Sequence, residues 1–251
     1  MRVRTGIAGT LAAGAMTMTL LAAQAHAAVI WNAEALSDPD RVFENVGSNC
    51  SDTGNSVTAV QDSAARGMVW RYEKASGSNR CESKGVATNN VNYVFQNGTT
   101  RFFGWESRLS SAVDNHAVFQ WKSNTDGAQN WPVVLKMVGG HLTMLQRQPN
   151  AAEQTIWTSP APVGANSWNR IAVGMKFSDT VDGGWVQLWF NGVRQTFKQG
   201  TPESTQHWKC QTWDTPGGGN KPKWGVYGAK DHSVIHSIND LKMGNTVEDV
   251  D

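Results

Sequence analysis

The sequence predicts an all-β protein, built as an antiparallel β-sandwich of two sheets. From residue 67 onward, apolar and β-favouring residues alternate over short runs that are bounded by Gly, Asn, Asp or Pro. Two of these runs are followed by Gly139-Gly140 and Asn191-Gly192, residue pairs that suit tight hairpin turns. Eleven such runs in one domain imply two stacked sheets.

The predicted strands follow one another without an internal repeat or a linker. They span residues 67–72, 80–84, 93–96, 101–109, 117–122, 132–138, 141–146, 170–177, 185–190, 223–229 and 237–243. The one helical candidate is a short segment at 38–44, where Asp38 is suited to cap a helix with Pro39 at its first position. The irregular stretches 148–165 and 200–222 are predicted loops, and loops of that length are usually functional walls or lids.

The first 27 residues have the pattern of a cleavable export signal. Arg2 and Arg4 precede an uncharged stretch rich in Ala, Leu and Met, which ends in the small-x-small triplet Ala25-His26-Ala27. This stretch falls short of the roughly 20 apolar residues that span a bilayer. We therefore expect a secreted, extracellular protein in which residues 28–251 form a single domain.

The charge of the chain is balanced, with 22 basic and 21 acidic side chains. Removal of the signal takes away two arginines, so the mature protein carries a net charge near −1. Global charge therefore does not direct the protein to nucleic acid or to membranes. Affinity for a polyanion must therefore come from a local cluster of charges on one surface. Separately, we expect the protein to be a monomer.

Three cysteines in an extracellular protein predict one disulfide and one free thiol. Pairing of Cys50 with Cys81 is favoured over the pairings with Cys210, because the shorter loop is easier to close. The cysteine spacing does not match that of a zinc site.

Three predicted strands carry charged or polar side chains on one face. The period of two places His116, Val118, Gln120 and Lys122 on one face and Ala117, Phe119 and Trp121 on the other. The amide of Gln120 and the ammonium of Lys122 are then about 7 Å apart, a pair suited to holding a carboxylate.

The same rule groups Lys223, Gly225 and Tyr227, and it groups Arg80, Glu82 and Lys84. A bare glycine between two long side chains is expected to leave room for a ligand over the strand. One charged strand face is usually an ordinary solvated surface, but three such faces in a chain of average charge favour a binding groove.

At these residues the sequence resembles the jelly-roll polysaccharide lyases, the group that holds heparin lyase I, alginate lyases and glucuronan lyases. The resemblance runs from about Trp70 to Gly244. The matching pieces are Gly77-Ser78-Asn79-Arg80-Cys81-Glu82, Phe119-Gln120-Trp121-Lys122, Trp168-Asn169-Arg170 leading to Trp185 and Asn191-Gly192, Lys223-x-Gly225-x-Tyr227, and Asn239-Asp240-Leu241. Each piece alone is weak, and their order makes the group assignment specific.

The resemblance implies a concanavalin-like jelly roll and assigns roles to four residues. Arg80 and Gln120 would hold the uronate carboxylate, Tyr227 would deliver the proton or both remove and deliver it, and Lys223 would lie beside it. Further substrate contacts are expected from Lys122, Glu82, Lys84, Trp131 and Arg147. No cofactor is implied with certainty. By analogy, a structural Ca²⁺ would use Asp240 and Glu34.

One position departs from the alginate and heparin branches, because Lys122 stands where their Gln-x-His strand has a histidine. A lysine with an ordinary pKa near 10.4 is charged and suits carboxylate binding better than proton abstraction. The base is then Tyr227 itself or a histidine, with His116, His232 and His236 as candidates. This departure, together with the stretch Asn79-Arg80-Cys81-Glu82, favours the glucuronan lyases within the group.

The implied reaction is β-elimination, which removes the C5 proton of a uronate and expels the oxygen on C4. An ionised carboxylate makes C5 a poor acid, so cations packed against it stabilise the charge that develops. Free tyrosine, with a pKa of about 10, is protonated near neutral pH, and nearby cations favour its phenolate. Lys223 and Arg80 are the cations expected there.

The tryptophans divide into two groups. Trp121, Trp185 and Trp189 alternate as core residues do, whereas the others of interest lie in or beside loops, where sugar stacking competes with packing. These others are Trp131, Trp157, Trp208 and Trp213.

Two other functions stay open on the sequence alone. A non-catalytic, lectin-like carbohydrate-binding protein would use the same sandwich, and binding without unsaturated products would identify it. A glycoside hydrolase needs two carboxylates about 5 to 10 Å apart, and the strand with Glu106 and Arg108 offers only one acid.

Overall fold

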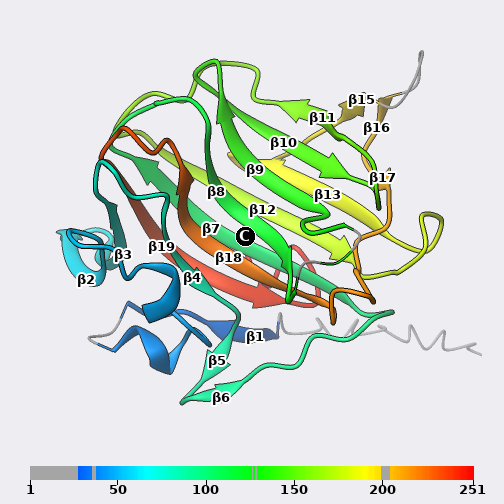
Figure 1. Cartoon of the computed structure of the whole chain (residues 1–251), viewed down its shortest axis with the longest axis horizontal. Helices are drawn as coiled ribbons and strands as arrows, with labels where there is room; N and C mark the ends of the chain where they lie inside the picture. The colour runs from blue at the N-terminus through cyan, green and yellow to red at the C-terminus, as the bar shows by residue number, and fades with distance from the viewer. Residues whose placement is uncertain (1–27, 36–37, 126, 128, 199–203) are drawn as a thin grey trace, which may run out of the picture.

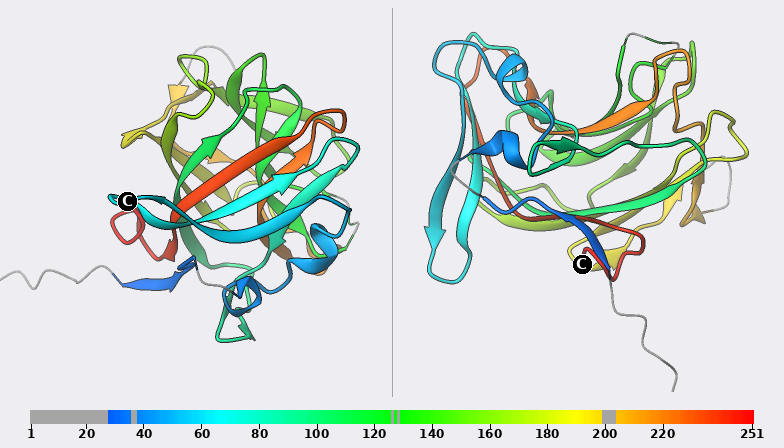
Figure 2. Two further views of the ribbon diagram at one scale, coloured as in Figure 1. Left: turned by 90° about the vertical axis from the view of Figure 1, so that its left-hand side faces the viewer. Right: turned by 90° about the horizontal axis from the view of Figure 1, so that it is seen from below.

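The computed structural model describes residues 28–35, 38–125, 127, 129–198 and 204–251. The predicted signal peptide at 1–27 lies outside these residues. The chain folds into two large antiparallel sheets, and in Figure 1 the smaller sheet, with β18 in orange, lies in front of the larger one. Figure 2 shows the two sheets as stacked layers. The prediction of an antiparallel all-β sandwich is confirmed.

The larger sheet has the strand order β14-β13-β12-β7-β19-β3-β2, with β1 paired to β19 and β17 paired to β13. Its strands are β1 (Val29–Asn32), β2 (Ser56–Ser63), β3 (Gly67–Lys74), β7 (Thr100–Leu109), β12 (Trp168–Lys176), β13 (Trp185–Phe190), β14 (Val193–Arg194), β17 (Trp208–Lys209) and β19 (Val234–Gly244).

The smaller sheet has the order β11-β10-β9-β8-β18-β4. Its strands are β4 (Arg80–Lys84), β8 (His116–Ser123), β9 (Val133–Val138), β10 (His141–Arg147), β11 (Glu153–Thr158) and β18 (Asn220–Gly228). Two short hairpins, β5 (Ala87–Thr88) with β6 (Val91–Asn92) and β15 (Phe197–Lys198) with β16 (Ser204–Thr205), lie outside both sheets. Two 3-10 helices, η1 (Pro39–Arg41) and η2 (Gly47–Asn49), precede β2.

The core between the sheets is rich in aromatic rings. Trp121 stacks on Phe177 with ring centroids 4.5 Å apart, and Trp105 lies 5.2 Å from Phe119. Each such side chain, when fully buried, contributes about 2 to 3 kcal/mol of hydrophobic stabilisation. This packing makes the two sheets a firm support for the side chains on their outer faces.

Several local predictions are confirmed. Gly139-Gly140 joins β9 to β10 and Asn191-Gly192 joins β13 to β14, and all four residues have positive φ, as tight hairpin turns require. The helical candidate at 38–44 is the 3-10 turn η1, where the Asp38 carboxylate accepts a hydrogen bond from the Asp40 amide at 3.1 Å.

Other strand predictions are wrong. The predicted loops 148–165 and 200–222 contain β11, β17 and the start of β18, and the strands β1 and β2 were not predicted. The segment 93–96 is not a strand, because Phe95 is held by packing against Phe103, Trp121 and Phe177 instead of by a ladder of hydrogen bonds.

The smaller sheet contains two β-bulges, and the one in β8 changes the predicted faces of that strand. The pairing of β8 with β9 shifts between Ala117 and Phe119, and that of β18 with β8 shifts between Trp224 and Tyr227. A bulge inserts one residue and reverses the alternation beyond it. In β8, Val118 therefore joins the core and His116 is fully buried, so the prediction that they share the outer face with Gln120 is wrong. Ala117, predicted to face the core, lines an outer cavity instead, whereas Lys223 and Tyr227 of β18 face outward as predicted.

The expectation that Trp185 and Trp189 are core residues is also wrong. Their neighbours Val186, Leu188 and Phe190 belong to the core, and the two indoles, both partly exposed, lie on the outer face of the larger sheet. Trp121, by contrast, is buried in the core as predicted.

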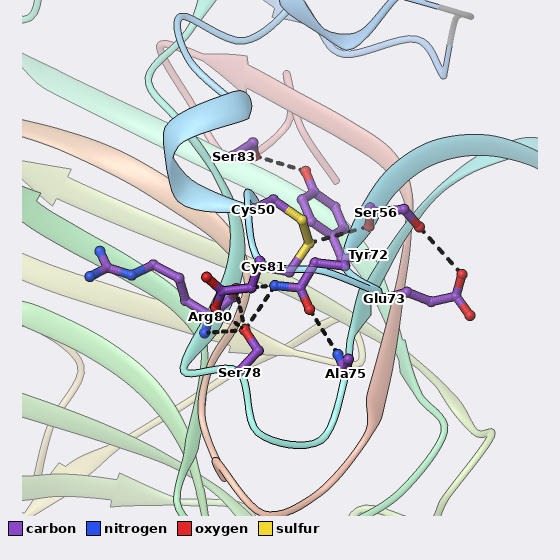
Figure 3. The surroundings of a disulfide bond; sticks show 11 residues. Cys50, Ser56, Tyr72, Glu73, Ala75, Ser78, Arg80, Cys81 and Ser83 are labelled. Carbon is purple, nitrogen blue, oxygen red and sulfur yellow. Dashed lines mark hydrogen bonds between the residues drawn. A yellow bond between two sulfur atoms is a disulfide. The ribbon is translucent and has the colours of Figure 1, made fainter.

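The predicted disulfide is present, and it joins Cys50, which follows η2, to Cys81 in β4. Figure 3 shows this bond with Arg80 extending away from it. Cys210 is a buried free thiol, as expected. None of the helices in the described part of the chain has the length and apolar character needed to cross a membrane.

Candidate active site

A polar groove lies on the outer face of the smaller sheet. Its cavity of about 550 Å³ is lined by side chains from β4, β8 and β18, by residues beside Trp131 and by the segment around η2. The predicted residues Arg80, Gln120, Lys223 and Tyr227 all line it, and so do Lys84, Lys122 and Trp131. A second cavity shares Gln120, Trp131 and Tyr227 and extends the groove over β9 and β10.

Arg80 and Tyr227 meet at one end of the groove. They are directly paired across β4 and β18, and the Arg80 guanidinium carbon lies 5.6 Å from the centroid of the Tyr227 ring. Tyr227 is 43% exposed, and its partner on the other side is the small residue Ala117. The phenol is therefore beside a cation and open to a ligand.

Gln120, Lys223 and Lys84 form a row across the three strands, because Lys223 pairs with Gln120 on one side and with Lys84 on the other. The Gln120 amide donates a hydrogen bond of 2.5 Å to a Glu82 oxygen. The Lys223 ammonium donates to the Asn49 side-chain oxygen at 2.8 Å and lies 3.5 Å from the other Glu82 oxygen.

Glu82 is the buried centre of this network and is only 2% exposed. Burial raises the pKa of its carboxyl, an effect that Lys223, Gln120 and Arg80 offset in part. Burial lowers the pKa of Lys223, while Glu82 favours its charged form. Glu82 thus orients the amide and the ammonium that reach the groove, because both lie within contact distance of its two oxygens.

The pKa of Lys84 is also lowered, first by burial and then by repulsion from Lys221 and Lys223. Glu44 opposes this effect and forms a 2.5 Å ion pair with Lys221. Because several cations share this region, the groove is suited to an anionic ligand.

Gly225 does not leave room for a ligand, contrary to the sequence prediction. Its φ is +134°, and a Cβ atom there would lie 2.3 Å from the Cys81 carbonyl oxygen and 3.0 Å from the Tyr72 ring. Glycine is required because β4 approaches the β18 bulge closely.

The predicted histidines do not line the groove. His116 and His236 are fully buried, and burial lowers the pKa of each to about 4. The His236 ring bonds to the Gly225 carbonyl at 2.8 Å and to the Ser107 hydroxyl at 2.7 Å. His232 lies exposed on the turn after β18 and lines neither part of the groove.

The remaining predicted binding residues are near one another but differ in their access to the groove. Trp131 lines both parts of it, and the Arg147 guanidinium lies 5.8 Å from the Trp131 ring without lining the cavity. Among the other loop tryptophans, Trp157 and Trp208 are buried and Trp213 packs against the core.

The sequence reasoning missed the wall formed by the η2 segment, where Glu44, Asn45, Ser48 and Asn49 line the groove. The disulfide was the signal that pointed there. Cys50 directly follows Asn49, and Cys81 lies between Arg80 and Glu82, so the predicted bond brings Asn49 beside the charged strand face.

The calcium expectation gains no support from the geometry. Asp240 and Glu34 line one cavity on the larger sheet, but the Asp240 carboxylate pairs with Arg170 at 3.0 Å and Lys242 at 2.7 Å. The described residues hold no group of three or more His, Cys, Asp or Glu side chains arranged for a metal ion.

A jelly-roll sandwich is the fold that the resemblance to polysaccharide lyases predicts. The family model described as polysaccharide lyase matches residues 34–240, which is most of the chain. The chain belongs to this family and is a polysaccharide lyase.

Solved structures agree on the fold. An endo-β-1,4-glucuronan lyase from the fungus Trichoderma reesei matches with a TM-score of 0.58 at 18% identity, covering 83% of this chain and 93% of that chain. An alginate lyase of polysaccharide lyase family 7 matches with a TM-score of 0.51 at 13% identity, over 78% of this chain and 84% of that chain.

The same fold also occurs outside lyases. The binding domain of botulinum neurotoxin DC in complex with rat synaptotagmin II matches with a TM-score of 0.50 at 14% identity, over 78% of this chain and 44% of that chain. No curated protein sequence matches this chain significantly. At these identities the structural likeness shows the fold alone.

Proposed function

We propose that this protein is a secreted lyase that cleaves a glucuronan-type polysaccharide by β-elimination and releases unsaturated oligosaccharides. The observation that carries the proposal is the meeting of Arg80, Gln120, Lys223 and Tyr227 in one groove. In this proposal residues 28–251 form a single domain, and the protein is a monomer. The export pattern at 1–27 and the disulfide support secretion.

Arg80 and Gln120 bind the uronate carboxylate in this proposal. The Gln120 amide nitrogen has two hydrogens, and its bond to Glu82 uses one of them, so the other is available to the substrate. As the C5 proton leaves, negative charge moves onto the carboxylate, and each fixed donor stabilises it by about 3 kcal/mol. Lys122 and Lys84 add positive charge along the same groove.

Tyr227 acts as both base and acid. His116 and His236 are buried and His232 lines neither part of the groove, whereas the Tyr227 ring is exposed beside Arg80. In its deprotonated form the Tyr227 oxygen takes the C5 proton and so becomes a hydroxyl. The same hydroxyl then returns a proton to the departing O4.

The stereochemistry of the substrate supports a single tyrosine. In a 4-linked glucuronate the C5 hydrogen and the C4 oxygen lie on the same side of the ring, so one group can reach both. The lysine at position 122 and the fold shared with a fungal glucuronan lyase favour the same polymer.

The test is ultraviolet absorbance of unsaturated products on a panel of glucuronan, alginate, heparin and neutral polysaccharides. We expect absorbance to rise with glucuronan. Tyr227→Phe should lower the rate by roughly 10²- to 10⁴-fold, the usual scale of a lost acid–base group. Tyr93→Phe is the matched control, because the Tyr93 hydroxyl bonds to Arg101 outside the groove.

Retained elimination in Tyr227→Phe would rule out the role of the tyrosine. Binding to the polymers without absorbance on the whole panel would instead favour a lectin-like protein.

A further inference from the structure

Three aromatic rings cluster on the outer face of the larger sheet, on the side of the sandwich opposite the groove. Trp185 and Trp189 extend outward from β13, and Phe102 extends from β7 between them, with ring centroids 6.3 and 6.0 Å away. All three side chains are partly exposed, and none belongs to the core cluster.

Cationic side chains surround these rings. Lys176 and Lys209 are the cross-strand partners of Trp185 on its two sides. Arg194 pairs with Trp189, and its guanidinium carbon lies 5.4 Å from that ring. Within the described ranges, no acidic side chain forms a salt bridge with any of these three cations. We call the six residues Phe102, Lys176, Trp185, Trp189, Arg194 and Lys209 the outer platform.

The shape and chemistry of the outer platform suit a sugar chain. Trp185 and Trp189 are four residues apart on one strand, which separates them by about 13 Å. The apolar face of a pyranose ring packs on an indole, and the flanking cations complement carboxylates on the same chain. A packing role alone does not explain why aromatic rings and unneutralised cations share one exposed surface.

We propose that the outer platform is a second, non-catalytic binding surface for an acidic polysaccharide. It lies on the outer face of the larger sheet and the groove lies on the outer face of the smaller one, so the whole sandwich separates them. A short oligosaccharide therefore cannot occupy both, whereas a long polymer can. The platform holds the protein on its polymer and raises the local concentration of cleavable sites.

A second copy of this chain fits the same surface less well. An isologous contact would bring the cationic patch of one copy against that of the other, and like charges oppose such a contact. A polyanion removes this repulsion.

Two variants test the proposal by independent means. Trp185→Ala with Trp189→Ala removes the rings, and Lys176→Glu with Lys209→Glu reverses the charge without touching the rings. Met68→Ala is the control, because Met68 is an exposed apolar side chain on β3, near the opposite edge of the same sheet. Thermal unfolding identifies any variant that does not fold, and the lysine variant decides the question if the tryptophan variant fails.

Binding is measured by electrophoretic retardation in gels that contain polyglucuronate, in the Tyr227→Phe background. We expect both platform variants to bind the polymer about tenfold more weakly, and the control to match the parent. In the Tyr227-containing protein, kcat/KM should fall several-fold on the polymer and stay unchanged on a short oligosaccharide. Gel retardation measures binding and requires no cleavage. A protein without lyase activity would refute the proposed reaction, and the retardation of the platform variants would still confirm or refute the second binding surface.

Unchanged retardation in both folded variants overturns the proposal. A protein that is dimeric in size-exclusion chromatography, and that becomes monomeric in the platform variants, also overturns it, because the surface would then belong to a second copy.

Discussion

Replacing Glu82 by Gln tests how the groove is organised. The carboxylate is 2% exposed, its partner Lys223 is 6% exposed, and the two are joined by a 3.5 Å ion pair. Loss of the negative charge leaves a buried ammonium with Asn49 as its remaining side-chain partner. Breaking a buried pair in this way costs about 3 to 5 kcal/mol, or roughly 10 °C in Tm for a domain of this size.

The activity of Glu82→Gln should fall as well, by about 10²-fold, because Gln120 loses the acceptor that fixes its amide. The double variant Glu82→Gln with Lys223→Met separates the two effects. With both charges gone, stability should return to within about 1 kcal/mol of the parent, since replacing a whole buried pair is often neutral. Activity should stay low.

The assays are chemical denaturation for stability and ultraviolet absorbance for elimination. A Glu82→Gln variant with the stability and activity of the parent would refute the view that this buried pair organises the groove. A double variant that is no more stable than Glu82→Gln would refute the electrostatic explanation.

Three further predictions concern the surroundings of the groove. Replacing Cys50 and Cys81 together by Ser should lower the free energy of unfolding by about 4 kcal/mol, because the disulfide closes a loop with a sequence separation of 31. The change should also lower activity more than Cys210→Ala does. Equal activity in the two variants would show that the η2 segment keeps its place in the groove without the disulfide. The free energy of unfolding should fall as pH drops from about 6.5 to about 4, because both histidines are protonated in the unfolded chain over this range while His116 and His236 stay neutral in the fold. The loss amounts to about 3 kcal/mol for each histidine, and a free energy of unfolding that does not change over that pH range contradicts the prediction. Lys74→Met should destabilise the fold by about 3 kcal/mol and slow elimination, because the Lys74 ammonium holds together the turns beside Arg80 and Tyr227. It donates hydrogen bonds to the carbonyls of Ala75, Ser78, Ala229 and His232. Lys230→Met, at an exposed lysine in one of these turns, is the control, and equal effects from the two variants would contradict the prediction.

Much of the fold was predictable because strand alternation is a local property. The ends of β4 and β13 match the prediction, and Arg80, Gln120 and Tyr227 lie in one groove as their strand positions suggested. Short strands such as β17 were not predictable, because their pairing depends on a distant partner and not on a repeating pattern of their own.

Where the alternation was read wrongly, the cause was tertiary. The bulge in β8 turns His116 inward, and only the apolar Val118 on the face predicted to be polar indicated this. In β13 both faces carry large apolar residues, and the polar Gln187 was the one sign that the face of Trp185 and Trp189 points away from the core. The position of Asn49 in the groove was predictable only from the disulfide of the neighbouring Cys50.

The most direct test of the central claim is mass spectrometry of the oligosaccharides that the protein forms from glucuronan. Elimination at the groove predicts products lighter by one water than the corresponding hydrolysis products, formed by the parent and absent with Tyr227→Phe. Saturated products, or unsaturated products at an undiminished rate from Tyr227→Phe, would contradict the account.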